Sequence, residues 1–337
     1  MQNAEFRIQT RRVANDGVES GATFQRFAHK VPSAFCILHS ELQMSVFETH
    51  MESIAAGVSL SADDIRELAA TPDILPLGML ADTLRRRLHG ARATFLRVAA
   101  CRFDQSFSDA VPPSAGEIRI LGAPDTLDVA VTAVATAKDV AGIRTVAAFS
   151  WADVDRWAAG GRHAQVLETL RSAGLDAIAE LPLDTIADPA DAIRLLRSAG
   201  FDGLRLSVSR VPAADRTQLL LAAADLQKEF GGIQSLDPLP AALNAFRPTT
   251  GYEDVKMVAI GRLAAPNIPS IQVDWQRYGP KLAQVALTFG ADDIYGVSPS
   301  DEAPEGRRRA PLEEIRRNID AAGFEPVERN GRFSTAP

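Results

Sequence analysis

The polar residues best suited to chemistry lie in one stretch of the sequence, Pro248 to Val297. Within it, Gln272 and Asp274 fall on the same side of a predicted strand, because side chains alternate along a strand. In a barrel the C-terminal strand ends face the pocket, so polar side chains there are candidates to hold a substrate. We predict the following substrate-binding residues: Gln272, Asp274, Trp275, Asp292 and Asp293. The alternative is that Gln272 and Asp274 form structural hydrogen bonds at a barrel rim. In that case Asp292 and Asp293 would only form a loop and the start of a strand.

Residue spacing identifies no complete catalytic or metal-binding set, so the catalytic residues stay unassigned. The chain has 2 cysteines and 5 histidines, and the histidines form no H-x-x-H or H-E-x-x-H spacing. We therefore expect no zinc or non-haem iron site. Cys101 as a nucleophile would need a base, which its neighbours do not offer, so a small buried residue is the favoured interpretation. The carboxylates of Glu180, Asp184 and Asp274 near predicted strand ends are candidates for acid–base catalysis.

Composition narrows the class of protein and of partner. The chain has 337 residues, of which 46% are hydrophobic and 23% charged, as in soluble globular proteins. A net charge of −7 argues against a nucleic-acid partner, which usually requires a basic surplus. The sequence contains no apolar run long enough to span a membrane and no secretory signal pattern. With so few cysteines, we expect a cytoplasmic protein without a disulfide framework.

Strand-like and helix-like segments alternate through most of the chain. Between the strand-like runs lie amphipathic helical patterns, an order that favours βαβ units and a parallel sheet. The count of strand-like runs matches a closed α/β barrel, a (βα) barrel of the TIM type with about eight strands. The predicted strands cover residues 93–98, 117–121, 145–149, 177–181, 203–208, 233–236, 270–273 and 293–297.

The same patterns divide the chain into segments. Residues 1–43 are polar and without sustained periodicity, so we predict a disordered leader or an incorrectly assigned start, since Met44 is a second plausible start. Residues 44–90 are predicted to form an N-terminal helical segment, and residues 91–300 the βα barrel. Residues 301–337 are predicted to form a C-terminal helix and tail that pack on the barrel.

Three consecutive runs of sequence resemble a known enzyme family. They read GYEDVKMVAIGRL, NIPSIQVDW and YGPKLAQVALTFGADDIYG, within residues 251–296. These runs resemble the C-terminal part of the radical S-adenosylmethionine enzymes of futalosine-dependent menaquinone synthesis, namely aminofutalosine synthase and dehypoxanthine futalosine cyclase. The resemblance extends over about residues 44–329 and implies a radical-enzyme βα barrel, in agreement with the strand count.

The resemblance also implies chemistry for which the sequence lacks the ligands. The family binds a [4Fe–4S] cluster through a C-x3-C-x2-C motif after the first strand, and the cluster binds S-adenosylmethionine. Here that region contains only Cys101, and Cys36 lies outside it. The nearby Asp104, Ser106 and Asp109 are hard oxygen donors, poorly matched to a cluster. We therefore predict no cofactor.

These observations leave three functional hypotheses. The first is a degenerate family member, a pseudoenzyme without radical chemistry that serves as partner, scaffold or ligand-binding protein. Its partner would be a menaquinone-pathway enzyme or a small-molecule intermediate, and a homo-oligomer is compatible with the sequence. The second is a barrel enzyme retargeted to acid–base chemistry. The third is a genuine transferase or lyase of menaquinone biosynthesis despite the missing motif. An open polar pocket near Gln272 and Asp274 would favour ligand binding, whereas a pocket filled by the loop after Cys101 would favour a scaffold.

Overall fold

A computed structural model describes residues 46–210, 213–242, 249–306 and 308–335. The predicted leader, residues 1–43, and the start at Met44 lie outside the described residues. Residues 46–337 form one compact unit, and only this unit is considered below.

Eight parallel strands form a closed ring in this unit. Each strand pairs with the next along the chain, and the first strand pairs with both the second and the eighth. The predicted fold class, an α/β protein with a (βα) barrel of about eight strands, is therefore confirmed. The strands are β1 Arg92–Arg102, β2 Glu117–Leu121, β3 Thr145–Ser150, β4 Ala177–Pro182, β5 Leu204–Val208, β6 Ile233–Pro240, β7 Ser270–Asp274 and β8 Asp293–Val297.

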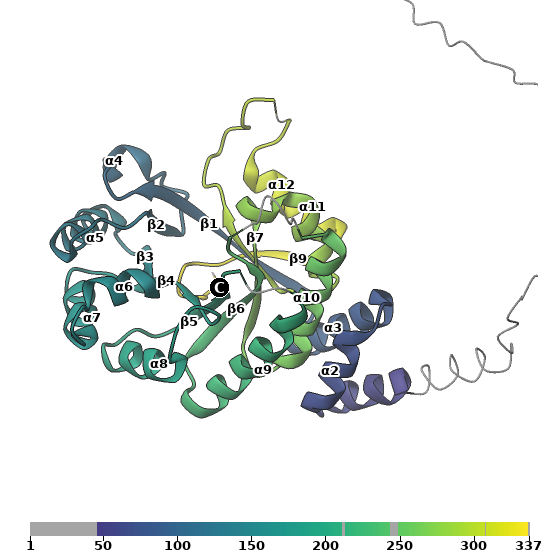
Figure 1. Cartoon of the computed structure of the whole chain (residues 1–337). Coiled ribbons are helices and arrows are strands. Elements are labelled where there is room, and N and C mark those ends of the chain that lie inside the picture. Colours follow the sequence, from purple (N-terminus) through teal and green to yellow (C-terminus); the bar gives the residue numbers. More distant parts are fainter. Residues whose placement is uncertain (1–45, 211–212, 243–248, 307, 336–337) are drawn as a thin grey trace, which may run out of the picture. The chain divides into compact units, whose positions relative to one another are not determined.

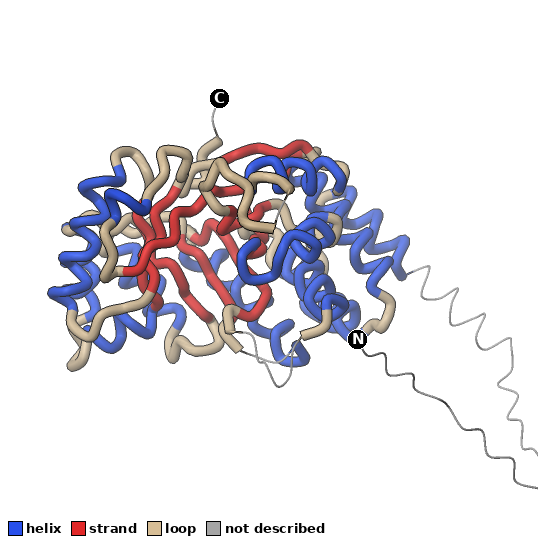
Figure 2. The backbone as a smooth tube through the Cα atoms, turned by 90° about the horizontal axis from the view of Figure 1, so that it is seen from above, coloured by secondary structure: helices blue, strands red, loops and turns tan. Residues whose placement is uncertain are grey.

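Helices surround the ring of strands, as the two perpendicular views show (Figures 1 and 2). Residues 46–56 are also helical and precede the first labelled helix. The labelled helices are α2 Ala62–Ala70, α3 Ile74–His89, α4 Phe107–Ala110, α5 Leu127–Ala141, α6 Trp151–Trp157, α7 His163–Ser172, α8 Pro189–Ser198, α9 Ala213–Phe230, α10 Gly251–Ala264, α11 Trp275–Leu287 and α12 Pro311–Ala321.

Local sequence signals explain where α10 and α11 begin. The Thr250 hydroxyl accepts a hydrogen bond from the Glu253 amide at 3.2 Å, and the Glu253 carboxylate accepts one from the Thr250 amide at 3.2 Å. This reciprocal pair is the capping box that the sequence predicts for α10. Helix α11 is interrupted at Gly279, whose φ of 76° lies in the left-handed region, and Pro280 begins its second segment.

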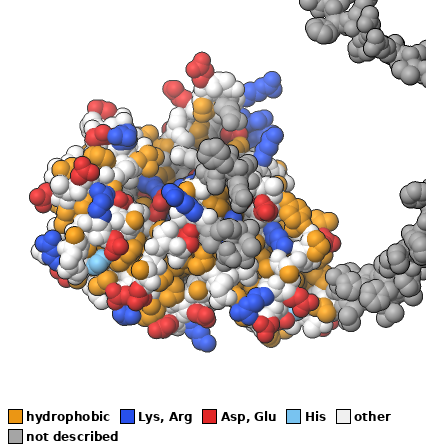
Figure 3. Space-filling view, viewed as in Figure 1, with side chains coloured by type: hydrophobic (Ala, Val, Ile, Leu, Met, Phe, Trp, Pro, Cys, Tyr) orange, Lys and Arg blue, Asp and Glu red, His pale blue; other side chains and the backbone are white. Residues whose placement is uncertain are grey.

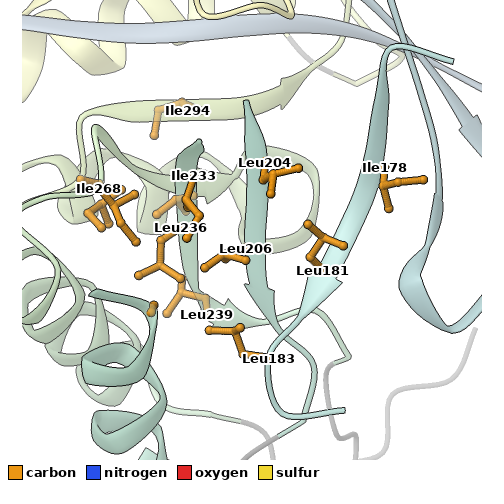
Figure 4. Packing of buried hydrophobic residues seen from close by; sticks show 14 of the residues in the cluster. Ile178, Leu181, Leu183, Leu204, Leu206, Ile233, Leu236, Leu239, Ile268 and Ile294 are labelled. Atoms are coloured by element: carbon orange, nitrogen blue, oxygen red, sulfur yellow. The ribbon is translucent and has the colours of Figure 1, made fainter. Parts of the chain in front are cut away.

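Alternation along the strands separates an apolar layer outside the ring from a polar interior. In β2, Ile118 and Ile120 belong to the buried apolar cluster, whereas Arg119 lines the interior. Figure 4 shows leucine and isoleucine side chains of β4, β5 and β6 side by side in the apolar layer. Burial of this layer against the helices supplies the main hydrophobic stabilisation. Charged and polar groups line much of the interior, together with apolar residues such as Ala179 and Ala241.

The C-terminal segment closes one end of the ring. A ninth strand, β9 Glu325–Glu328, pairs in parallel with residues 92–95 of β1. The segment that follows, yellow in Figure 1, crosses the middle of the ring. There Gly331 lies so close to β3 that an added Cβ would stand 2.5 Å from the Thr145 Cβ. Thr145 begins β3, so the tail covers the N-terminal ends of the strands, which we call the base of the barrel.

Within the described residues, no helix combines the length and apolar character needed to cross a membrane. Figure 3 shows acidic and basic side chains interspersed over the face that it draws. Neither charge dominates that face.

Candidate functional site

The C-terminal half of the lumen holds a small polar cavity, which we call the mouth site. Charged side chains from β2, β4, β6, β7 and α11 line it, together with Tyr295 of β8. The cavity has a volume of only about 30 Å³, enough for about two water molecules. The principal polar residues of the mouth site are Arg119, Glu180, Asp237, Asp274, Arg277 and Tyr295.

Ion pairs fill most of the mouth site, and they differ in tightness. Arg119 donates to Glu180 at 2.6 Å, whereas Arg277 stands 3.7 Å from Glu180 and 3.8 Å from Asp274. Burial disfavours the charge of Arg119, but Tyr295 and Glu180 outweigh this effect, so the pKa of Arg119 lies above its usual value. The Arg277 and Glu180 side chains are 25% and 33% exposed. Arg277 is thus the loosely held member.

Asp237 is a carboxyl of the mouth site whose pKa lies near neutrality. It lies in β6, where the pairing with β5 shifts register, and its Oδ1 accepts a hydrogen bond from the Leu239 amide at 2.9 Å. Loss of water contact raises the pKa of Asp237 to about 7, although the Leu239 amide and Arg277 oppose the shift. Asp274 and Glu180 add to the increase, because nearby negative charges disfavour ionisation. Both protonation states are therefore accessible near neutral pH.

The base of the barrel is built from tighter pairs. Arg329 of the tail donates to both carboxylate oxygens of Asp293 at 2.6 Å, and Gln272 donates to Asp293 at 2.6 Å. Arg205 donates to the two oxygens of Glu117 at 3.0 and 2.6 Å. Both carboxylates are fully buried, yet the attached guanidinium groups hold their pKa values below the usual range despite the cost of burial.

The structure distributes the predicted substrate-binding residues over several places. Asp274 lies at the mouth and caps α11 by accepting from the Arg277 amide at 3.0 Å. Gln272 also lines the lumen, but its amide bonds to Asp293 at the base. Trp275 is 9% exposed and belongs to the apolar core. Asp292 accepts from the Ile271 amide at 2.7 Å and pairs with Arg262 of α10. The role of these residues in substrate binding stays a prediction.

Strand direction explains this separation. Asp274 ends β7, whereas Asp293 begins β8, so the two carboxylates lie at opposite ends of a parallel pair. The pairing of Gln272 with Asp293 follows directly, because these residues are opposite one another in the register. Of the acid–base candidates, Glu180 and Asp274 meet in the mouth site. Asp184 lies apart and accepts from the amides of Ser209 and Arg210 at 2.6 and 2.7 Å.

Cys101 occupies a buried position near the end of β1. It is 2% exposed, and its Sγ lies 3.9 Å from the carbonyl oxygen of Ala110. Burial raises the pKa of this thiol. The described residues contain no group of three or more histidine, cysteine or acidic side chains arranged to hold a metal ion. Among the described lining residues of the mouth site, none comes from residues 103–116, which follow β1. Ion pairs, rather than that segment, fill the mouth.

Sequence reasoning missed Arg119, Asp237 and Arg277. A signal existed for Arg119, since it stands between two isoleucines in a short strand and alternation directs it inward. Asp237 also interrupts an apolar run of β6. Nothing in the sequence around Arg277 indicates that its side chain reaches Glu180 of β4.

Comparison with known proteins shows which enzymes this chain is similar to. The family model for the CofH/MqnC C-terminal region matches residues 238–337. Two relatives align over most of their length: a 5-amino-6-(D-ribitylamino)uracil–L-tyrosine 4-hydroxyphenyl transferase from Methanoculleus marisnigri and an aminodeoxyfutalosine synthase from Thermus thermophilus. The first is 26% identical over 73% of this chain and 84% of the relative, the second 24% identical over 84% and 94%. The C-terminal part of this chain thus matches the CofH/MqnC family model, and most of the chain is similar to these two enzymes.

The resemblance that the sequence suggested is thereby confirmed. The transferase of Archaeoglobus fulgidus shows a higher identity over a shorter region, 37% over 35% of this chain, and the match spans only 38% of that relative. Among solved structures, the fold of this chain is similar to methylornithine synthase (PylB), with a TM-score of 0.59 and 14% identity over 82% of this chain and 97% of that chain. The hydrogenase maturase HydG from Carboxydothermus hydrogenoformans gives a TM-score of 0.61 with 15% identity over 89% and 83%. At such low sequence identities, these two structures are evidence for the fold alone.

Proposed function

We propose that this chain is a family member that works without radical chemistry and binds a polar intermediate of futalosine-dependent menaquinone synthesis at its mouth site. The observation that carries the proposal is the cysteine content. A [4Fe–4S] cluster of this type needs three thiolates. Cys101 is the single cysteine in residues 46–337, and its thiol is buried against Ala110. These residues do not fit the cluster, so no step of the proposal involves it.

The mouth site supports a ligand-binding role. Three guanidinium groups and the carboxylates of Glu180 and Asp274, with Asp237 beside them, offer both donors and acceptors to a polar molecule. The free volume is small, so a ligand must move the Arg277 side chain away from Glu180 and Asp274 and can then contact its guanidinium group. That displacement is inexpensive, because both Arg277 contacts are longer than a direct hydrogen bond and a partly exposed ion pair contributes about 0–1 kcal/mol.

Iron and sulfide analysis after anaerobic purification and cluster reconstitution tests the first part. We expect no stoichiometric cluster and no 5′-deoxyadenosine from added S-adenosylmethionine. A stoichiometric cluster would overturn the proposal. The C101A variant is the matched control, since any iron bound adventitiously will not depend on this thiol.

Calorimetric titration tests the second part with compounds taken from the relatives' reactions: aminodeoxyfutalosine, L-tyrosine and 5-amino-6-(D-ribitylamino)uracil. We expect aminodeoxyfutalosine to bind, with at least about tenfold weaker binding in E180Q, because a charged hydrogen bond is worth about 1.5–3 kcal/mol. Binding of L-tyrosine or of the uracil compound alone would contradict the assignment to menaquinone synthesis. Absence of binding for all three would favour a scaffold or partner role instead.

A second candidate function rests on a separate observation. Glu180, Asp237 and Asp274 line one cavity together with a cation, which is the arrangement that acid–base catalysis requires. A barrel enzyme retargeted to proton transfer would use these carboxylates rather than a cluster. Proton-exchange activity that depends on Glu180, Asp237 or Asp274 supports this alternative.

A further inference from the structure

Asp237 occupies a position in the mouth site unlike that of the other carboxyls. Its neighbours Glu180 and Asp274 are in reach of Arg277, whereas the partner of Asp237 in the described chain is the Leu239 amide at 2.9 Å. That bond involves Oδ1 and fixes the orientation of the carboxyl toward the cavity that it lines. The backbone amide of Leu239 therefore orients Asp237, and its carboxyl forms no direct ion pair within the described residues.

Charged groups surround Asp237 from every side of the lumen. A carboxyl beside a cation, next to space for a small group, is the arrangement of a base that removes a proton and a cation that stabilises the resulting anion. Arg277 is the cation that acts on Asp237, and it carries the looser contacts. The charged and titratable groups that face Asp237 or line the same cavity are Arg119 of β2, Glu180 of β4, Arg205 of β5, Asp274 of β7, Tyr295 of β8, and Arg277 and Tyr278 of α11.

We propose that Asp237 is a general acid–base residue that exchanges one proton with a carbonyl compound entering the mouth between Glu180 and Arg277. This inference deepens the second candidate function above and rests on it. The substrate class is a small compound with an acidic C–H bond next to a carbonyl or an equivalent electron-withdrawing group. A near-neutral pKa, due to burial, lets Asp237 serve as base and as acid at the same pH.

The step conserves atoms and charge. The Asp237 carboxylate takes the proton of the C–H bond, and the electron pair of that bond moves into the carbonyl group to give an enolate. The Arg277 guanidinium stabilises the negative oxygen. The protonated Asp237 then returns a proton to carbon or to oxygen, so the net reaction is exchange or isomerisation without any oxidant.

Carbon-13 NMR of aspartate-labelled protein tests the proton-holding role. Between about pH 5 and about pH 9, we expect one carboxyl to titrate with a midpoint of about 7, far above an ordinary aspartate at about 3.9. D237N removes that signal. E180Q lowers the midpoint because it removes a negative neighbour, and R277M raises it because it removes a positive one. A spectrum in which no carboxyl titrates in this range would overturn the proposal.

Hydrogen–deuterium exchange of nitroethane in D₂O tests the catalytic role, because loss of its acidic proton gives a nitronate that resembles an enolate. We expect exchange catalysed by the wild-type protein to rise with pH and level off above about 7, and to fall about a hundredfold in D237N. The asparagine introduced by D237N retains a carbonyl oxygen that can accept from the Leu239 amide, so folding is preserved. D225N, which changes an exposed aspartate of α9, is the matched control and should exchange like the wild type.

The outcomes separate the two proposals. Exchange that D237N retains but E180Q or D274N abolishes would overturn the assignment to Asp237 and leave acid–base chemistry in the mouth site. Exchange equal to that of buffer would overturn both. Neither result bears on the absence of a cluster, which the iron analysis decides.

Discussion

The two ends of the barrel lumen use the same residue types in opposite ways. At the base, arginine–carboxylate pairs are bidentate, buried and 2.6–3.0 Å long. At the mouth, Arg277 stands 3.7 and 3.8 Å from its carboxylates, and its side chain is 25% exposed. The base is also covered by the C-terminal tail, where the Phe333 ring lies 3.9 Å from the Arg329 guanidinium. The base is built to hold one geometry.

The difference between the ion pairs of the two ends indicates where the barrel tolerates an exchange of side-chain partners. A buried pair with every hydrogen bond made is costly to break, because the remaining charge stays in a medium that cannot solvate it. A partly exposed pair is screened by solvent and contributes little, so its members are free to exchange partners. The loosely held mouth is therefore the end at which we propose ligand binding, whereas the tight pairs of the base hold the fold together.

Breaking the Arg329–Asp293 ion pair at the base should have the largest effect on the free energy of unfolding. R329M leaves Asp293 buried without its guanidinium, and we expect a loss of about 3–5 kcal/mol in the free energy of unfolding. Urea denaturation at neutral pH measures it. The double variant R329M/D293N removes both charges and should recover at least half of the loss. A cost below about 1 kcal/mol for R329M would show that the base is not the rigid end.

Removing the Asp237 carboxyl at the mouth should produce the next largest change in the free energy of unfolding. This change should be an increase, whereas R329M causes a decrease. The folded-state pKa of Asp237 is about 7, raised from 3.8, so the protonated form favours folding and this contribution is lost as pH rises from about 4 through 7. D237N should therefore gain about 2–4 kcal/mol relative to the wild type between about pH 4 and about pH 8. Urea midpoints across this range measure the gain. D225N, at an exposed position of α9, is the control, and a gain for D237N that does not vary with pH would contradict the assigned pKa.

A third comparison probes packing at the base rather than charge. In G331A the new Cβ would meet Thr145 Cβ at 2.5 Å and Glu117 Oε2 at 2.8 Å. Overpacking of this kind costs about 1–3 kcal/mol, measured as a shift in thermal unfolding. G251A is the control, because its nearest neighbour is Leu282 Cδ1 at 3.9 Å. Equal stability of the two variants would mean that the tail moves away easily.

The smallest effect is expected at the mouth. R277M removes the loosely held guanidinium and should change the free energy of unfolding by less than about 1 kcal/mol. Urea denaturation measures this change, and the same small value in high salt would agree with a screened pair. If R277M lowered the free energy of unfolding as much as R329M, the ion pairs of the mouth would not be weaker than those of the base.

Sequence patterns predict the barrel well because each βα unit is marked by local signals. All the predicted strands recur in the ring, and the Thr250–Glu253 capping box starts α10 as expected. The strand β9 is less evident, since the four residues of Glu325–Glu328 include no strong apolar alternation and their pairing depends on β1.

The site is harder to predict than the fold. Placing Gln272 and Asp274 on one side of β7 is within reach of simple alternation. Their hydrogen-bond partners cannot be predicted in this way. Gln272 bonds to Asp293, and that carboxylate is paired with Arg329, much later in the chain. Likewise the cavity depends on how Arg277 and Glu180 meet across the lumen, which no local pattern encodes.

The position of β9 has a consequence for the order of events during synthesis. The first strand, beginning at Arg92, takes residues 325–328 as one of its neighbours, and Arg329 then pairs with Asp293. A ribosome must therefore complete nearly all of the residues described here before the first strand can find its last partner. Contacts this distant in sequence slow folding, so the nascent barrel exposes the polar end of its interior until late in translation. A chain shortened before β9 would form its helices and its ring of strands but would leave Asp293 at the base without a guanidinium partner from the tail.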